Sequence, residues 1–108
     1  MKYKLIEEKI LLEELNKIIK EMDAEIYFSF AGPSEERVCL ENINGIWTVY
    51  TYERGRKHHI KEYDMLYGAC IKVIDTLANT NKESEKYIEK FETILRRWIK
   101  WNTKAYKK

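Results

Sequence analysis

Residues 37–62 decide the fold, and they read RVCLENINGIWTVYTYERGRKHHIKE. Over residues 37–42 a valine and a leucine share one face, which is typical of a strand with one buried side. Asn44-Gly45 is a strong hairpin signal, because both residues tolerate a positive φ. Aromatic and β-branched residues fill both faces of residues 46–52, so this run is predicted to be the central strand of a sheet.

Two further strands are predicted, one on each side of this hairpin. Residues 54–56 read Arg-Gly-Arg and predict a second turn, after which residues 57–62 form a short polar strand whose charges suit a sheet edge. Upstream, apolar and polar residues alternate over residues 25–30, which predicts a half-buried first strand with Ile26, Phe28 and Phe30 on its buried side. Because the four strands follow one another with short connections, an antiparallel meander is expected.

Helices are predicted before and after the strands. Residues 4–22 carry an apolar stripe at three- and four-residue spacing without glycine or proline. A second stripe follows Asp64, the expected N-cap, and Thr80 and Glu83 have capping-box spacing for a last helix. The predicted fold class is α+β: an N-terminal helix, a four-stranded antiparallel meander sheet and two C-terminal helices, in a single domain of residues 1–108.

The composition predicts the cellular location of the protein. Of its 108 residues 44% are hydrophobic and 35% charged, which is typical of a globular protein with a heavily charged surface. No apolar run approaches the roughly 20 residues that span a bilayer, and glutamates at positions 7, 8, 13 and 14 do not suit a signal peptide. A cytoplasmic protein without a membrane partner is expected, with Cys39 and Cys70 reduced and buried.

No pattern in the sequence predicts a catalytic or metal site. His58 and His59 are neighbours on a predicted strand and should point to opposite faces. Cys39 and Cys70 do not have zinc-ligand spacing to them, and nothing near Cys39 marks it as an activated nucleophile. Phosphate-binding and hydrolase motifs are missing from the sequence. No enzyme, metal or cofactor is therefore expected; a small enzyme with an unrecognised site is the minor alternative.

The last helix has an uneven charge. The chain has a net charge of +2, which is too small to imply nucleic acid, yet residues 90–108 contain seven lysines and arginines and one glutamate. Basic groups bind phosphates and aromatic rings stack on bases, so this helix is a candidate nucleic-acid surface. The candidate residues are Arg96, Arg97, Lys100, Trp98 and Trp101. The alternative is that Trp98 lies in the core and the cations form a solvated helix end.

The central strand offers a second candidate surface. Tyr50 and Tyr52 share one of its faces, and Trp47 and Val49 share the other. If the helices leave one face uncovered, its aromatic residues would form a protein-binding patch. If the helices divide between the two faces, these residues are core.

The motifs in the middle of the chain have a counterpart in a known family. They are an asparagine-glycine-x-tryptophan-x-valine-tyrosine hairpin, a glutamate-arginine-glycine turn and a helix rich in alanine, cysteine and tyrosine. They occupy residues 36–41, 44–50, 53–55 and 63–77. In this respect the chain resembles small bacterial immunity proteins, which are encoded beside polymorphic or contact-dependent-inhibition toxins. The resemblance covers about residues 25–77 and does not reach the first or last helix.

The resemblance implies a function in protein binding. An immunity protein inhibits the C-terminal domain of its cognate toxin and needs a stable, charged surface rather than a catalytic group. Individual toxin-contacting residues do not carry over from the motif. From the surface of the predicted sheet we expect the contacts to come from Glu53, Arg54, Arg56, Tyr50 and Tyr52. A homodimer is compatible with this function, and nucleic-acid binding by the last helix is the alternative.

Overall fold

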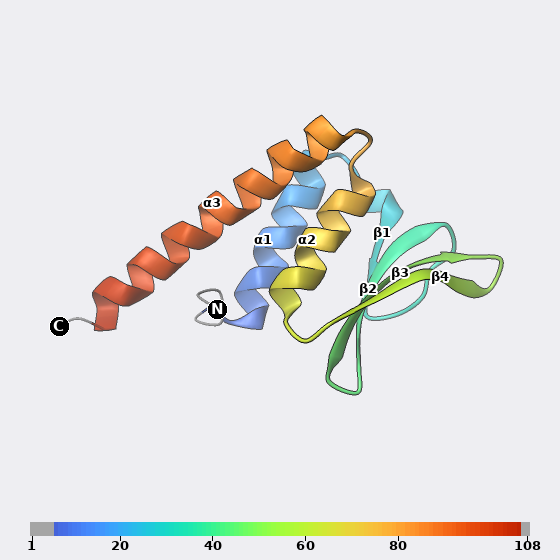
Figure 1. Cartoon of the computed structure of the whole chain (residues 1–108), viewed down its shortest axis with the longest axis horizontal. Coiled ribbons are helices and arrows are strands. Elements are labelled where there is room, and N and C mark those ends of the chain that lie inside the picture. The colour runs from blue at the N-terminus through green and yellow to red at the C-terminus, as the bar shows by residue number, and fades with distance from the viewer. Residues whose placement is uncertain (1–5, 107–108) are drawn as a thin grey trace.

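The computed structural model describes the backbone of residues 6–106 and the side chains of residues 6–100. It contains a four-stranded sheet and three α-helices, which all lie on the same side of the sheet (Figure 1). The elements in chain order are α1 (Glu8–Glu21), a 3₁₀ turn (Glu25–Tyr27), β1 (Phe28–Phe30), β2 (Arg37–Ile43), β3 (Ile46–Glu53), β4 (Arg56–Tyr63), α2 (Leu66–Leu77) and α3 (Asn81–Tyr106). The predicted α+β class and the order of helix, strands and two helices are confirmed.

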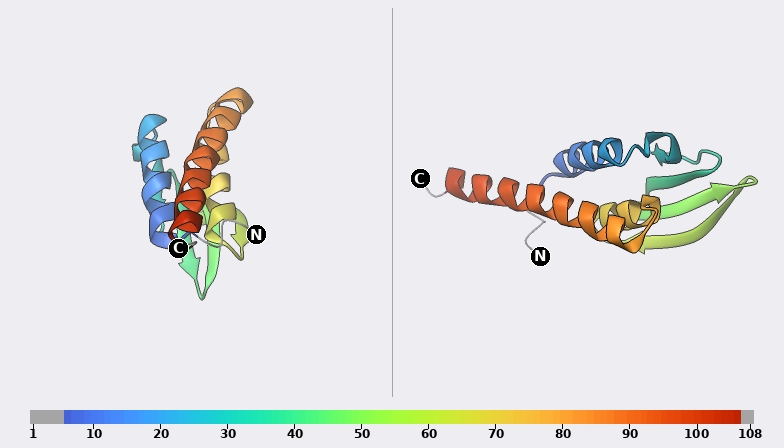
Figure 2. Two further views of the ribbon diagram at one scale, coloured as in Figure 1. Left: turned by 90° about the vertical axis from the view of Figure 1, so that its left-hand side faces the viewer. Right: turned by 90° about the horizontal axis from the view of Figure 1, so that it is seen from above.

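The helices form two layers against the sheet. α2 packs directly on β2, β3 and β4, α1 lies beside α2, and α3 crosses both of them on the side away from the sheet (Figure 2). α3 has 26 residues, a length of about 39 Å at the usual helical rise, and its C-terminal half extends beyond the other two helices (Figure 1). Within the described part of the chain, none of the helices combines the length and apolar character needed to cross a membrane.

The predicted hairpin at Asn44-Gly45 is confirmed, and the structure supplies its register. The strands are ordered β1-β2-β3-β4, and Leu40 of β2 lies opposite Val49 of β3 in an antiparallel pair. Asn44 and Gly45 form the turn with φ angles of 53° and 88°, which the asparagine-glycine pair permits at low cost. The Asn42 side chain accepts a hydrogen bond of 2.9 Å from the Gly45 N–H and closes the turn.

The predicted all-antiparallel meander is wrong at β1. β1 pairs with β2 in parallel, with Phe28 opposite Val38 and Phe30 opposite Leu40. A parallel pair usually needs a crossover of a dozen residues or more. Here β1 is only three residues long, so residues 31–36 are enough to return the chain to the same end of the sheet. The sheet is therefore mixed.

The helix ends follow local capping signals in one case and not in the other. Thr80 caps α3 as predicted, because its Oγ1 accepts a hydrogen bond of 3.1 Å from the Glu83 N–H. Asp64 does not cap α2: the helix begins at Leu66, with Met65 at the cap position and no side-chain hydrogen bond there. The predicted first helix extends over residues 4–22, of which residues 4 and 5 lie outside the described chain.

A single apolar cluster joins the helices to one face of the sheet. Each large aliphatic or aromatic side chain that it buries completely contributes about 1.5–3 kcal/mol. Trp47 and Val49 belong to this cluster, so they are core residues, and the Trp47 indole donates a hydrogen bond of 2.7 Å to the Glu8 carboxylate of α1. The side chains with no measurable exposure in this cluster are Leu15, Leu40, Ala69, Cys70, Val73, Ile74, Phe91 and Leu95.

Both cysteines are free and buried, as predicted. Cys70 lies on the core face of α2, and burial alone raises the pKa of its thiol. Cys39 lies on the opposite face of the sheet, with its Sγ 3.9 Å from the Ser34 carbonyl oxygen. Burial is also the main cause that raises the pKa of Cys39. A thiol held protonated in this way is a poor nucleophile.

Candidate functional site

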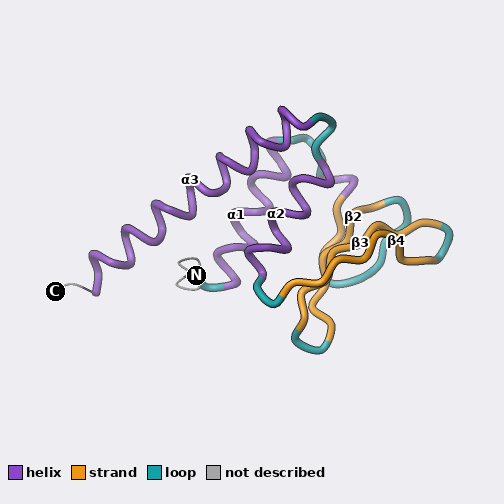
Figure 3. Tube along the Cα trace, viewed as in Figure 1, coloured by secondary structure: helices purple, strands orange, loops and turns teal. Residues whose placement is uncertain are grey.

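The far end of the β3–β4 hairpin projects beyond the helices (Figure 3). Along β3 the residues from Trp47 to Tyr50 are buried, Thr51 and Tyr52 are half-buried, and Glu53 is exposed. β4 is exposed along nearly its whole length. We define the hairpin tip as Glu53, Arg54, Gly55 and Arg56. All four tip residues are exposed, and they include the three charged residues expected at an interface.

The hairpin tip is braced by the loop that connects β1 to β2. The Glu35 carboxylate accepts hydrogen bonds from the backbone N–H groups of Arg54 and Gly55. One residue further, the Glu36 N–H donates a hydrogen bond of 2.8 Å to the carbonyl oxygen of Tyr52. The turn itself has positive φ angles of 52° at Arg54 and 74° at Gly55. The Glu35 carboxylate stabilises this conformation, because it accepts hydrogen bonds from both N–H groups. The tip is therefore an ordered projection.

A β-bulge lies in β4 close to the tip. His59 and Ile60 together face Tyr50 of β3, and His59 has a φ of 54°. The prediction that His58 and His59 point to opposite faces depended on regular alternation, which the bulge interrupts; the two imidazole centroids lie 6.3 Å apart. His59 Nδ1 lies 3.3 Å from the Thr51 hydroxyl. Over the residues described, no three or more His, Cys, Asp or Glu side chains form a group that could hold a metal ion.

Tyr50 was expected to be an exposed contact residue, but the structure buries it. No helix covers its face of the sheet, yet its side chain is only 1% exposed. The Tyr50 hydroxyl donates a hydrogen bond of 2.8 Å to Glu41, and the Lys57 ammonium lies 4.7 Å from the ring centroid. Burial and the bond to Glu41 raise the pKa of Tyr50 far above its usual value. Tyr50 therefore holds neighbouring strands together, while the half-buried Tyr52 stays accessible on the same face.

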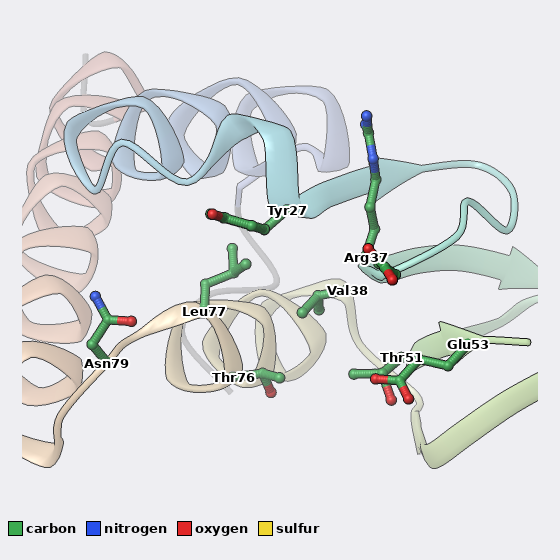
Figure 4. A pocket seen from close by; sticks show the side chains of 9 residues that line it. Tyr27, Arg37, Val38, Thr51, Glu53, Thr76, Leu77 and Asn79 are labelled. Atoms are coloured by element: carbon green, nitrogen blue, oxygen red, sulfur yellow. The ribbon is translucent and has the colours of Figure 1, made fainter.

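A pocket opens where β2 and β3 pass the end of α2 (Figure 4). Its volume is about 270 Å³. Val38 and Leu77 form apolar parts of its wall, the Tyr27 ring lies across from Leu77, and Glu53 of the hairpin tip lies at the β3 end. The lining residues are Tyr27, Glu36, Arg37, Val38, Thr51, Glu53, Thr76, Leu77 and Asn79. The tip and the pocket thus share Glu53 and form one continuous surface.

The segment beside the pocket exposes apolar residues that were expected to be buried. The predicted strand over residues 25–30 begins only at Phe28, because residues 25–27 form a 3₁₀ turn. Ile26 and Phe30, both expected on the buried side of a strand, are 67% and 49% exposed, and Tyr27, expected on the other side, is 55% exposed. Alternation of apolar and polar residues does not distinguish such a turn from a strand over so short a segment. Exposed large apolar side chains next to a pocket are typical of a binding surface.

The basic residues of α3 lie on a separate part of the molecule. Arg96, Arg97 and Lys100 are exposed, and no ion pair joins them to a carboxylate of the described side chains. Trp98 is half-buried and packs against the core cluster, so its ring is not a free stacking surface. The side chain of Trp101 lies outside the described residues. The structure therefore separates the expected basic residues from Trp98.

Comparison with family models, curated protein sequences and solved structures finds no match to the chain. Its function is inferred from its own sequence and surfaces. Two surfaces bear on that inference: the hairpin tip with its pocket at one end of the molecule, and the exposed cations of α3. The first is built from five separate segments of the chain, namely the 3₁₀ turn, the loop of residues 31–36, β2, the β3–β4 hairpin and the end of α2.

Proposed function

We propose that the chain is an immunity protein that binds the C-terminal domain of a cognate toxin and inhibits it by covering its working surface. The observation that carries this proposal is the braced and charged hairpin tip beside an open pocket. Glu53, Arg54 and Arg56 are exposed, while the Glu35 carboxylate fixes the backbone on which they stand. A surface that is ordered before binding loses less conformational entropy when a partner covers it.

The choice of a toxin as partner rests on the sequence resemblance. Its more distinctive motif, glutamate-arginine-glycine, occupies residues 53–55 and so coincides with the tip. Charges of both signs at the tip suit fast, electrostatically steered capture of a partner with a complementary surface. The pocket volume of about 270 Å³ lies below the roughly 300–1,000 Å³ of sites that enclose a small-molecule ligand. A protein partner therefore fits this surface better than a metabolite.

Affinity capture with the tagged chain from its native host tests the proposal. The bound fraction is identified by mass spectrometry and stained for nucleic acid. We expect a stoichiometric band from the C-terminal region of a large secreted protein. A tip variant that carries both Glu53→Lys and Arg54→Glu should weaken the capture at least tenfold, because it reverses two exposed charges and leaves the net charge unchanged.

A matched control reverses two exposed charges far from the tip. Lys9→Glu combined with Glu13→Lys alters exposed residues of α1 near the Trp47 end of β3 and also keeps the net charge. This control should capture the toxin as well as the wild type does. Recovery of nuclease-sensitive material without any protein partner would refute the immunity proposal. Equal capture by the tip variant and the control would refute the assignment of the site.

The exposed cations of α3 favour nucleic-acid binding as a second candidate function. Arg96, Arg97 and Lys100 are exposed in the C-terminal half of α3. This candidate predicts a gel shift with single- or double-stranded DNA at low salt, and an affinity that falls steeply as salt rises. Replacing the three cations by glutamine should abolish the shift. A chain that gives no shift even at low salt does not use this surface for nucleic acid.

A further inference from the structure

We infer that the pocket beside the hairpin tip takes a cationic side chain of the protein partner, an arginine in preference to a lysine. The inference rests on the proposed function, because the occupant is supplied by the bound partner. Three properties of the wall carry it: an apolar floor, an exposed aromatic ring and carboxylates that the chain itself does not neutralise. Each of them matches one part of an arginine side chain.

The floor suits the aliphatic stem of arginine. Val38 is 8% exposed and Leu77 is half-buried, and both side chains line the pocket on the side of it facing the Tyr27 ring (Figure 4). Long cationic side chains commonly lay their methylene groups on apolar surface of this kind and keep the charged head near water. The volume of about 270 Å³ suits one such side chain.

The ring suits the guanidinium group. Tyr27 lines the pocket and is 55% exposed, so a face of the ring is open to a cation. A cation over an aromatic face is attracted by the electron density of the ring. Guanidinium is planar and more weakly hydrated than ammonium, so it stacks on such a ring at a lower desolvation cost. This difference is the reason for the preference over lysine.

The charge of the wall suits a cation. Glu36 and Glu53 line the pocket, and neither forms an ion pair with any lysine or arginine in the described part of the chain. Arg37 is the cation among the nine lining residues, but its side chain turns away from the cavity (Figure 4). Its Nη1 donates a hydrogen bond of 3.3 Å to the Phe28 carbonyl oxygen. The two carboxylates are left for an external cation.

The wall is also held in place before a partner arrives. Val38 and Thr51 are opposite each other in the β2–β3 ladder, and Glu53 adjoins the turn that Glu35 braces. The hydroxyl of Thr76, also a lining residue, donates a hydrogen bond of 2.7 Å to the Lys72 carbonyl oxygen within α2. A preformed site loses little entropy on binding, so even an isolated arginine derivative should bind measurably.

Titration followed by ¹⁵N NMR tests the inference without the toxin. The probes are N-acetyl-arginine amide, the lysine equivalent and N-acetyl-citrulline amide, which has nearly the shape of arginine without its charge. We expect the arginine probe to shift the amide resonances of Tyr27, Val38 and Thr51 with a dissociation constant in the millimolar range. The lysine probe should bind more weakly, and the citrulline probe should leave these resonances in place.

A pair of matched variants tests whether the Glu53 carboxylate binds the arginine probe. Glu53→Gln should weaken binding of the arginine probe at least threefold. Glu62→Gln makes the same change on an exposed residue of β4 that lies opposite Thr48, and it should leave the affinity unchanged. Absence of any shift with the arginine probe, or equal shifts with citrulline, would overturn the inference.

Affinity capture of the toxin separates this inference from the proposed function. If Glu53→Gln weakens capture at least tenfold while Glu62→Gln does not, both are supported. If the toxin is captured equally well by Glu53→Gln, the arginine site is overturned and the immunity function stands. If no toxin is captured while the arginine probe still binds selectively, the proposed function fails and the pocket remains a cation site.

Discussion

The two halves of β3 have the same backbone conformation and opposite surroundings. From Trp47 to Tyr50 all the residues are buried, whereas Thr51 and Tyr52 are half-buried and Glu53 is exposed. The first half packs under α2 and reaches α1 through the Trp47–Glu8 hydrogen bond. The second half is held by backbone hydrogen bonds and the Glu35 carboxylate. One strand thus connects a part of the molecule that supplies stability to a part that is open to a partner.

The difference follows from the relative lengths of strand and helix. α2 has 12 residues, which extend about 18 Å at the usual helical rise. β3 has eight residues, which extend about 27 Å at the usual rise of a strand. The strand therefore continues past the end of the helix that covers it. Substitutions in the covered half should change folding stability, and substitutions in the open half should change recognition.

The largest effect is expected for Leu40→Ala on β2, beside the covered half of β3. Leu40 has no exposed surface and lies opposite Val49, so the truncation leaves a cavity that costs about 2–5 kcal/mol. Urea unfolding followed by tryptophan fluorescence measures this loss. Thr51→Ala, on the same face in the open half, should cost less than about 1 kcal/mol. Equal losses in the two variants would contradict the division of β3.

A smaller effect is expected for Tyr50→Phe, at the border between the halves. At neutral pH the lost hydrogen bond to Glu41 should cost about 1 kcal/mol. The folded state keeps the phenol protonated above the usual pKa near 10, where the unfolded state releases the proton. Stability is therefore complete below this pH and falls as pH rises through it.

The alkaline slope of the wild type should exceed that of Tyr50→Phe by up to about 1.4 kcal/mol per pH unit. Urea unfolding between pH 9 and pH 11.5 measures both slopes. Tyr63, Cys39 and Cys70 also have a pKa raised by burial, so a fall in stability should remain in the variant. Identical slopes in the two proteins would show that Tyr50 does not keep its proton.

A local effect with little change in global stability is expected for Glu35→Ala. The carboxylate is exposed, and exposed charge contacts contribute about 0–1 kcal/mol. The N–H groups of Arg54 and Gly55 lose their acceptor, so their hydrogen exchange should accelerate by about tenfold, which corresponds to about 1.4 kcal/mol of local opening. Glu62→Ala serves as the control. Unchanged protection at the tip would mean that Glu35 does not brace it.

The smallest effect on stability is expected for the doubly reversed tip variant, Glu53→Lys with Arg54→Glu. Both side chains are exposed, so the free energy of unfolding should stay within about 0.5 kcal/mol of the wild type. Thermal unfolding measures it. A larger loss would mean that the tip contributes to folding, and weaker binding by this variant could then no longer be assigned to lost contacts.

Local signals account for the parts of the fold that sequence predicts well. The β2–β3 hairpin follows from Asn44-Gly45, and the start of α3 follows from Thr80, because each depends on neighbouring residues only. The direction of β1 could not be predicted, since parallel and antiparallel strands of three residues have the same alternation. Ile26 was misplaced for the same reason: a 3₁₀ turn and a strand differ little over three positions.

The candidate site was predictable only in part. The exposure of Glu53, Arg54 and Arg56 follows from their place in a turn, and their contact with a partner stays a prediction. Tyr50 was expected on an open surface because the strand pattern does not show that the Glu41 and Lys57 side chains lie against it. The pocket could not be predicted, because its wall joins residues from the 3₁₀ turn, two strands and the end of α2.

The position of α1 has a consequence for how the chain folds during synthesis. α1 leaves the ribosome before the strands, but it packs against α2 and α3, which leave after them. The β2–β3 hairpin closes between neighbouring residues and can form as soon as Glu53 has emerged. Even then the apolar stripe of α1 has no partner and is open to chaperones. The nascent chain therefore exposes this stripe until α2 and α3 have been translated.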